Sequence, residues 1–133
     1  NNFIETVPRY SQSLPPAVDV ETAGNSTNTP DKDWLKNELR ICLQLLEKHY
    51  GQTPIIYADK LFYWKYLEEE FQDYDIWVRD IFFPPAFLLS PNWTIWQYHD
   101  RGGILGIDGP VDLNVYYSDW VSFDSFTNKT KGR

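Results

Sequence analysis

Short apolar runs and amphipathic stretches alternate along the chain. Apolar runs of strand length, bounded by turn residues, occupy residues 17–21, 53–59, 74–81, 93–99 and 110–117. Apolar residues repeat at helical spacing over residues 29–50, and a shorter helical stretch covers residues 60–71. Because helices alternate with apolar strands at first, the pattern predicts an α/β fold in which helices lie outside a parallel sheet.

The longer helix has start and stop signals in the sequence. Thr29 is the predicted N-cap, Pro30 takes the first helical position, and Gly51 ends the helix. Lys36 is placed on the solvated face. The predicted buried face carries four residues at helical spacing, namely Leu35, Leu39, Cys42 and Leu46.

The remaining segments are predicted to be connections and chain ends. Residues 82–91 form an irregular, proline-broken excursion, and residues 100–109 form a glycine-rich loop. A domain of residues 1–120 is expected to be followed by a polar, fraying tail at residues 121–133. The chain begins without Met and its first residues are typical of the end of a helix, so we expect the true N-terminus to lie upstream.

Composition narrows the function classes. With 133 residues the chain is at most one ordinary domain, and its net charge is −7. Nucleic-acid binding needs a basic stripe, which the scattered Lys and Arg do not supply, and the acidity argues against an anionic membrane surface. No apolar stretch approaches the length of a membrane span. One Cys and two distant His indicate neither an internal disulfide nor a metal site, and we expect no cofactor.

Two acids stand one residue apart at the end of the first apolar run. Asp19 and Glu21 bracket Val20, and residues i and i+2 of a strand point to the same side. Two such carboxylates repel, so one tends to keep its proton near neutral pH. A protonated acid beside an ionised one can cleave an acetal. The alternatives are a solvated pair at a strand-to-loop junction and a cation site, although a hard cation needs more oxygen ligands than these two.

The order of motifs along the chain adds a resemblance. The segments LPPAVDVE, PIIYAD, IWVRDI and WTIWQYHDRGGILGIDGPVDLNVYY follow one another from residue 14 to residue 117. This series resembles the glycoside hydrolase family 25 lysozymes, the Chalaropsis-type N-acetylmuramidases, and corresponds to about the C-terminal two-thirds of their catalytic domain. The resemblance implies a modified TIM-like (β/α) barrel that hydrolyses the β-1,4 bond between N-acetylmuramic acid and N-acetylglucosamine in peptidoglycan.

The resemblance also implies roles for individual residues. Glu21 matches the general acid, Asp19 its partner carboxylate, Asp112 an acid on the last strand, and Tyr57 an active-site tyrosine. Four further candidates for substrate binding lie on the later strands, namely Trp77, Trp96, Gln97 and Tyr98. Alternation on a strand makes Gln97 point opposite to its two aromatic neighbours, so either the amide or the aromatic pair faces the cleft. We expect the aromatic pair to be partly core and partly platform.

Two departures from the family pattern follow. Arg79 stands where a small residue is common, and no segment corresponds to the family's first-strand Asp. We therefore expect an incomplete barrel whose first strands are absent from the chain. Such a chain is either the retained part of a longer protein or associates with a second copy through its open sheet edge.

Several expectations about the whole protein stay open. The partner is peptidoglycan, the location secreted or at the cell envelope, and the mechanism either assisted by the substrate's N-acetyl group or a direct attack by water. The alternative function is a catalytically inactive glycan-binding module of the same fold.

Overall fold

The computed structural model describes residues 2–10, 13–22, 30–85 and 93–127. Within them one sheet contains five strands in the order of the sequence. The strands are β1 (Ala17–Val20), β2 (Ile55–Asp59), β3 (Asp75–Arg79), β4 (Trp93–Gly102) and β5 (Val111–Tyr116). Each lies within one of the five predicted apolar runs or begins in one, which confirms the strand predictions.

The sheet is mixed rather than wholly parallel. The first four strands pair in parallel, whereas β5 pairs antiparallel with β4. The expectation of a parallel sheet is therefore wrong for the last strand. The physical reason is the length of the connection: residues 103–110 are enough for a hairpin, while a parallel return needs a crossover of about a dozen residues or more. The described residues thus form a mixed α/β fold with an open sheet, and they do not close into a barrel.

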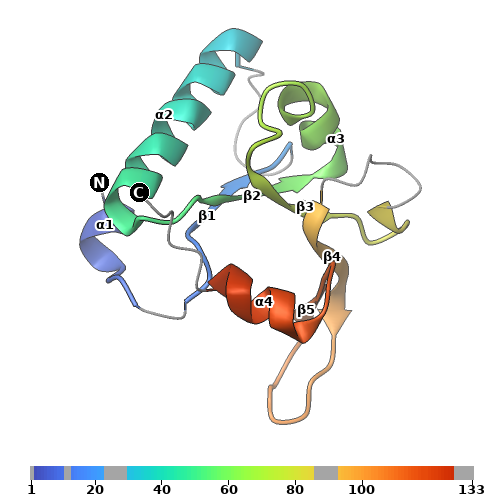
Figure 1. Cartoon of the computed structure of the whole chain (residues 1–133). Helices are drawn as coiled ribbons and strands as arrows, with labels where there is room; N and C mark the ends of the chain where they lie inside the picture. The colour runs from blue at the N-terminus through green and yellow to red at the C-terminus, as the bar shows by residue number, and fades with distance from the viewer. Residues whose placement is uncertain (1, 11–12, 23–29, 86–92, 128–133) are drawn as a thin grey trace.

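Helices cover both faces of the curved sheet (Figure 1). The first face packs against α2 (Lys32–Tyr50) and α3 (Lys60–Phe62), which continues into the π-helical η1 (Tyr63–Leu67). The other face, called here the inner face, meets α4 (Trp120–Thr127). The short α1 (Asn2–Thr6) lies near the end of α2, where the Tyr50 hydroxyl donates to the carbonyl oxygen of Val7 over 2.8 Å. No helix among the described residues is long and apolar enough to cross a membrane.

The N-terminus of α2 differs from the prediction. Asp31, not Thr29, is the N-cap, and its side chain accepts a hydrogen bond from the backbone N–H of Trp34. Thr29 itself lies outside the described residues. The predicted end is confirmed, because Gly51 has the left-handed φ of 72° that favours glycine at this position.

Cys42 and Lys36 of α2 differ in exposure from the prediction. Leu43 is fully buried, and Cys42, one residue earlier and turned by about 100°, is exposed. Lys36 is buried rather than solvated, because its ammonium pairs with Glu70 from the segment after η1. Glu70 also pairs with Arg40 over 2.9 Å, so the buried cation is compensated.

The predicted fraying tail is wrong for the part that forms α4. Phe126 of this helix is 2% exposed and packs with Ile55 and Ile95 on the inner face. The segment is rich in aromatic and polar residues with modest helix propensity, so tertiary packing rather than local preference stabilises it. The helix covers the end of the inner face at which the parallel strands begin. The polar side chains gather at the opposite end, where these strands finish.

Candidate active site

The acid pair lies at the carboxyl end of the edge strand β1. Asp19 belongs to the strand and Glu21 follows it directly, and both are exposed. Val18 and Val20 pack on the helix-covered face, so Asp19 between them points to the inner face. Its register partners are Tyr57 on β2 and then Trp77 on β3. The sheet therefore sets three of the predicted site residues side by side.

Tyr57 is the centre of this row. Its ring meets that of Trp77 edge-on, with 5.3 Å between the ring centroids. Its hydroxyl donates a hydrogen bond of 2.7 Å to Oε1 of Gln97 on β4, a residue that is 2% exposed. Trp77 in turn donates from Nε1 to Oδ1 of Asn114 on β5 over 2.8 Å. These contacts join the inner faces of β2, β3, β4 and β5.

The antiparallel strand brings the third predicted acid to the same edge. Asp112 is near the start of β5, which lies beside the end of β4. Burial, together with the charges of Glu21, Asp19 and Asp112, raises the pKa of Tyr57 to about 12, although the Arg79 guanidinium acts in the opposite direction. All three acids therefore lie within electrostatic reach of one hydroxyl, which stays protonated and able to donate at ordinary pH.

Glu21 holds its proton more strongly than an ordinary glutamate. Partial withdrawal of its carboxyl from water raises its pKa, and the neighbouring charge of Asp19 and a hydrogen bond between the two carboxyls act in the same direction. The charge of Asp59 also raises the pKa of Glu21, whereas the Arg79 guanidinium lowers it. A carboxyl with a raised pKa is suited to donating a proton to a group that lies against it.

The segment after Glu21 is fastened to the next strand. The backbone N–H and the hydroxyl of Thr22 both donate to Oδ2 of Asp59 over 2.7 Å. The other oxygen of Asp59 accepts from the backbone N–H of Phe62 and caps α3. One carboxylate therefore fixes both the exit from β1 and the start of α3, which limits how far Glu21 can move.

The residues flanking Gln97 lie on the opposite face of β4. Trp96 packs against the core beneath the helices, and its Nε1 donates to the carbonyl oxygen of Asp80 over 2.8 Å. Tyr98 contacts the ring of Trp96. Of the two arrangements left open by the sequence, the structure has Gln97 on the same face as the acids. It does not bring Trp96 and Tyr98 together with the other candidates.

Several polar residues of the inner edge were not singled out as site residues from the sequence. They are Asp59, Asp100 and Asn114, together with Arg79, which was noted only as a departure from the family pattern. All stand at or near the carboxyl ends of β2, β3 and β4, or near the start of β5. Polar residues that interrupt an apolar strand near its carboxyl end are a signal that could have found them. Among the described residues, no group of three or more His, Cys, Asp or Glu is arranged to hold a metal ion.

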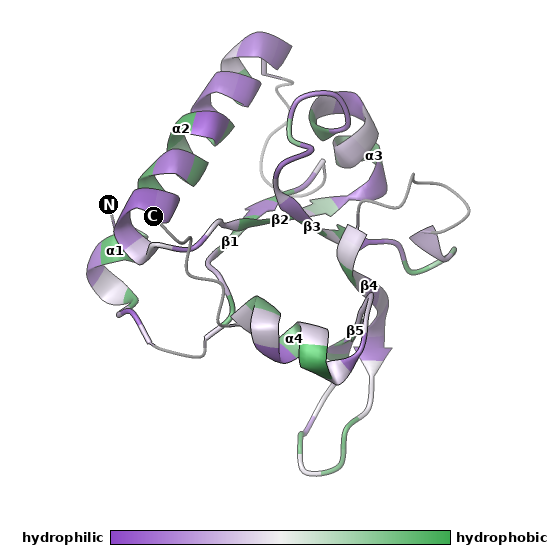
Figure 2. Ribbon diagram, in the orientation of Figure 1, coloured by the Kyte–Doolittle hydropathy of each residue, from purple (hydrophilic) through white to green (hydrophobic). Residues whose placement is uncertain are grey.

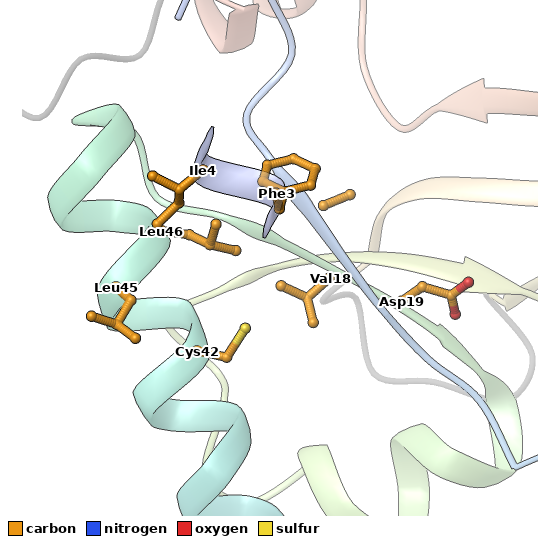
Figure 3. A pocket seen from close by; sticks show the side chains of 8 residues that line it. Phe3, Ile4, Val18, Asp19, Cys42, Leu45 and Leu46 are labelled. Atoms are coloured by element: carbon orange, nitrogen blue, oxygen red, sulfur yellow. The ribbon is translucent and has the colours of Figure 1, made fainter. Parts of the chain in front are cut away.

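Asp19 also borders a separate apolar pocket on the far side of β1. This pocket has a volume of about 290 Å³ and lies between α1, α2 and the edge strand. Its wall contains Phe3 and Leu46, with the exposed Cys42 at one side, while the carboxyl of Asp19 points away from them (Figure 3). The acid site and the pocket are therefore different features of the molecule.

Known sequences place these strands in a family. The sequence profile of Glycosyl hydrolases family 25 matches residues 1–107, so Asp112 lies beyond the matched part. The Escherichia coli K12 protein YegX is 31% identical over 129 residues, which is 97% of this chain and 46% of YegX. The chain thus spans about half the length of the curated relatives that it matches.

Solved structures give the same picture. A family 25 glycosyl hydrolase from Bacillus anthracis is 38% identical with a TM-score of 0.83, covering 94% of this chain and 59% of that one. A muramidase from Acremonium alcalophilum is 18% identical with a TM-score of 0.77 over 95% of this chain and 63% of its own, which shows a shared fold. Because the family profile covers most of the chain, including the strands that carry Asp19, Tyr57 and Gln97, the chain belongs to glycosyl hydrolases family 25.

Proposed function

We propose that the protein is a peptidoglycan hydrolase that cleaves the β-1,4 bond between N-acetylmuramic acid and N-acetylglucosamine. The observation that carries the proposal is the raised pKa of Glu21 beside Asp19, at the edge where Tyr57, Gln97 and Asp112 also lie. Muramidases and lysozymes among the structural neighbours support the substrate class. The open sheet is then an arc of a (β/α) barrel, and the protein acts in the cell envelope or outside the cell.

In this mechanism Glu21 protonates the glycosidic oxygen as the bond to the leaving sugar breaks. The positive charge that develops at the anomeric carbon is stabilised by a carboxylate, and Asp19 is the acid placed to do this. Asp19 acts in one of two ways: it orients the N-acetyl group of the substrate, which then attacks the anomeric carbon, or it assists water directly. Tyr57, held by Gln97, presents a neutral hydroxyl to the same space. Because its proton is donated to Gln97, its oxygen is left to accept a hydrogen bond from an N–H or O–H group of the substrate.

The test is a Glu21→Gln variant, which keeps the shape of the side chain and removes the acidic proton. We expect clearing of purified cell walls to fall by about 10²–10⁴-fold, the usual worth of general acid catalysis. Glu38→Gln is the matched control, because Glu38 is exposed on α2 and lies on the other side of the sheet. New reducing ends are identified by mass spectrometry. Muramic acid there supports the proposed bond, and N-acetylglucosamine there contradicts it.

The rival function is a glycan-binding module without catalysis. It predicts that the wild-type chain binds wall fragments and releases no reducing ends, and that Glu21→Gln changes neither property. Full activity in Glu21→Gln would remove Glu21 from the mechanism while leaving a hydrolase to be explained.

A further inference from the structure

Arg79 is a cation set among the acids of the inner face. It ends β3, two residues after Trp77, and its register partners are Asp59 on β2 and Gln97 on β4. Strand alternation puts its side chain on the same face as Trp77, one step nearer the carboxyl edge. Arg79 therefore lies in the same row as Asp59 and Gln97, directly above the row of Tyr57 and Trp77.

The guanidinium is held in place and is still accessible. Its Nη2 lies 3.0 Å from Oδ2 of Asp100, and the two side chains are 33% and 31% exposed. Among the described residues the Arg79 side chain forms this one hydrogen bond, which uses one of the five N–H donors of the guanidinium. A guanidinium presents its donors as a planar fork that matches a carboxylate. The guanidinium, held by Asp100, can therefore donate hydrogen bonds to a second carboxylate.

The guanidinium of Arg79 is surrounded by negatively charged groups. Arg79 acts electrostatically on both Glu21 and Tyr57, lowering the pKa of each. The same space holds the negative charges of Asp19 and Asp112. A negatively charged group on a glycan would be repelled there unless a cation receives it. The acids alone would favour neutral sugars, and Arg79 reverses that preference at one point.

We propose that Arg79 is a specificity-determining residue that binds a carboxylate carried by the glycan in the cleft. The proposal depends on the proposed function for the identity of the polymer. Two carboxylates are available in peptidoglycan: the lactyl carboxylate, which is free where the stem peptide has been removed, and those within the stem peptide itself. The position of Arg79 in the row above Tyr57, close to the acid pair, favours the lactyl group, because that group is attached to the sugar ring. The preferred substrate is then a glycan strand from which an amidase reaction has already removed the peptide.

The experiment compares three substrates that differ in this group. They are peptide-free glycan strands, the same strands with the lactyl carboxylate converted to a neutral methylamide, and peptide-bearing walls. Wild type should have a kcat/KM about 10–100-fold higher on the free acid than on the methylamide, which is the range for a charge-assisted hydrogen-bonded contact. Arg79→Gln should lose this ratio. Arg79→Lys should retain part of it, because the charge remains and the fork is lost.

Controls separate recognition from general damage. Arg40→Gln removes a comparably exposed arginine that also pairs with a carboxylate, but on the helix-covered side. It should leave the ratio unchanged. Preference for peptide-bearing walls that disappears in Arg79→Gln would move the bound carboxylate into the stem peptide. An equal ratio in wild type and Arg79→Gln, or no preference for either carboxylate in wild type, would overturn the proposal.

Binding provides a readout that does not depend on catalysis. The same three glycans are titrated into wild type and Arg79→Gln, both carrying Glu21→Gln to prevent turnover, and affinity is measured by calorimetry. A loss of about 10-fold or more in affinity for the free acid, with no change for the methylamide, supports Arg79 even if no wall is hydrolysed. Failure of the proposed function would instead appear as the absence of new reducing ends from wild type with every substrate.

Discussion

The packing of α4 makes a sharp stability prediction. Phe126 is 2% exposed, packs with Ile55 and Ile95, and has its ring centroid 5.5 Å from that of Tyr116. Phe126→Ala would remove the aromatic ring from this cluster. Such a change in a core costs about 3–5 kcal/mol, because the transfer energy is lost and a cavity remains. Since a whole domain is stable by only about 5–15 kcal/mol, the variant should lose roughly a fifth or more of its stability.

Urea unfolding followed by tryptophan fluorescence measures the effect. With a slope of about 2 kcal/mol per molar urea, a loss of this size lowers the midpoint by about 2 M. Val121→Ala is the matched control on the same helix, because Val121 is 73% exposed and its midpoint should change little. Equal midpoints for Phe126→Ala and Val121→Ala would refute the reasoning that α4 is held by burial of this ring.

The site makes three further predictions. Asp19→Asn removes a negative charge that raises the pKa of Glu21, so the basic limb of the pH–rate profile should move to lower pH; an unmoved limb with measurable residual activity would show that the acids are uncoupled. Tyr57→Phe leaves the buried Oε1 of Gln97 without its donor and should cost about 1–3 kcal/mol in urea unfolding, whereas wild-type stability would show that the bond contributes little. Asp112→Asn should raise KM more than it lowers kcat in a wall-fragment assay, because the residue is exposed at the start of β5, and the reverse split would give it a chemical role.

The strands and the acid pair could be predicted from the sequence because both depend on local pattern. Apolar runs bounded by turn residues specify strands, and two-residue alternation puts Asp19 and Glu21 on one side. The same alternation gives Gln97 a face opposite to its aromatic neighbours. It does not say which face is covered by helices, so the choice between the amide and the aromatic pair needed the structure.

Features that depend on contacts between residues distant in sequence could not be predicted from the local pattern. Phe126 forms part of a helix because Ile55 and Ile95 cover it, and these residues are far away in sequence. Lys36 is buried because Glu70 receives its charge, which no helical periodicity reveals. The antiparallel direction of β5 was readable in principle, since the connection after β4 is too short for a crossover.

In the hairpin of β4 and β5, the paired strands position a site residue, whereas the loop that connects them does not. Its loop projects beyond the sheet with hydrophobic residues along the tip, and Leu105 is fully exposed (Figures 1 and 2). The ladder between the two strands, not the loop, sets the register that delivers Asp112. Residues 103–110 can therefore be lengthened, replaced or made to carry a grafted module while the strands keep their alignment. This loop is thus a segment beside the acids that can change, in evolution or by engineering, while the sheet that carries the acids keeps its structure.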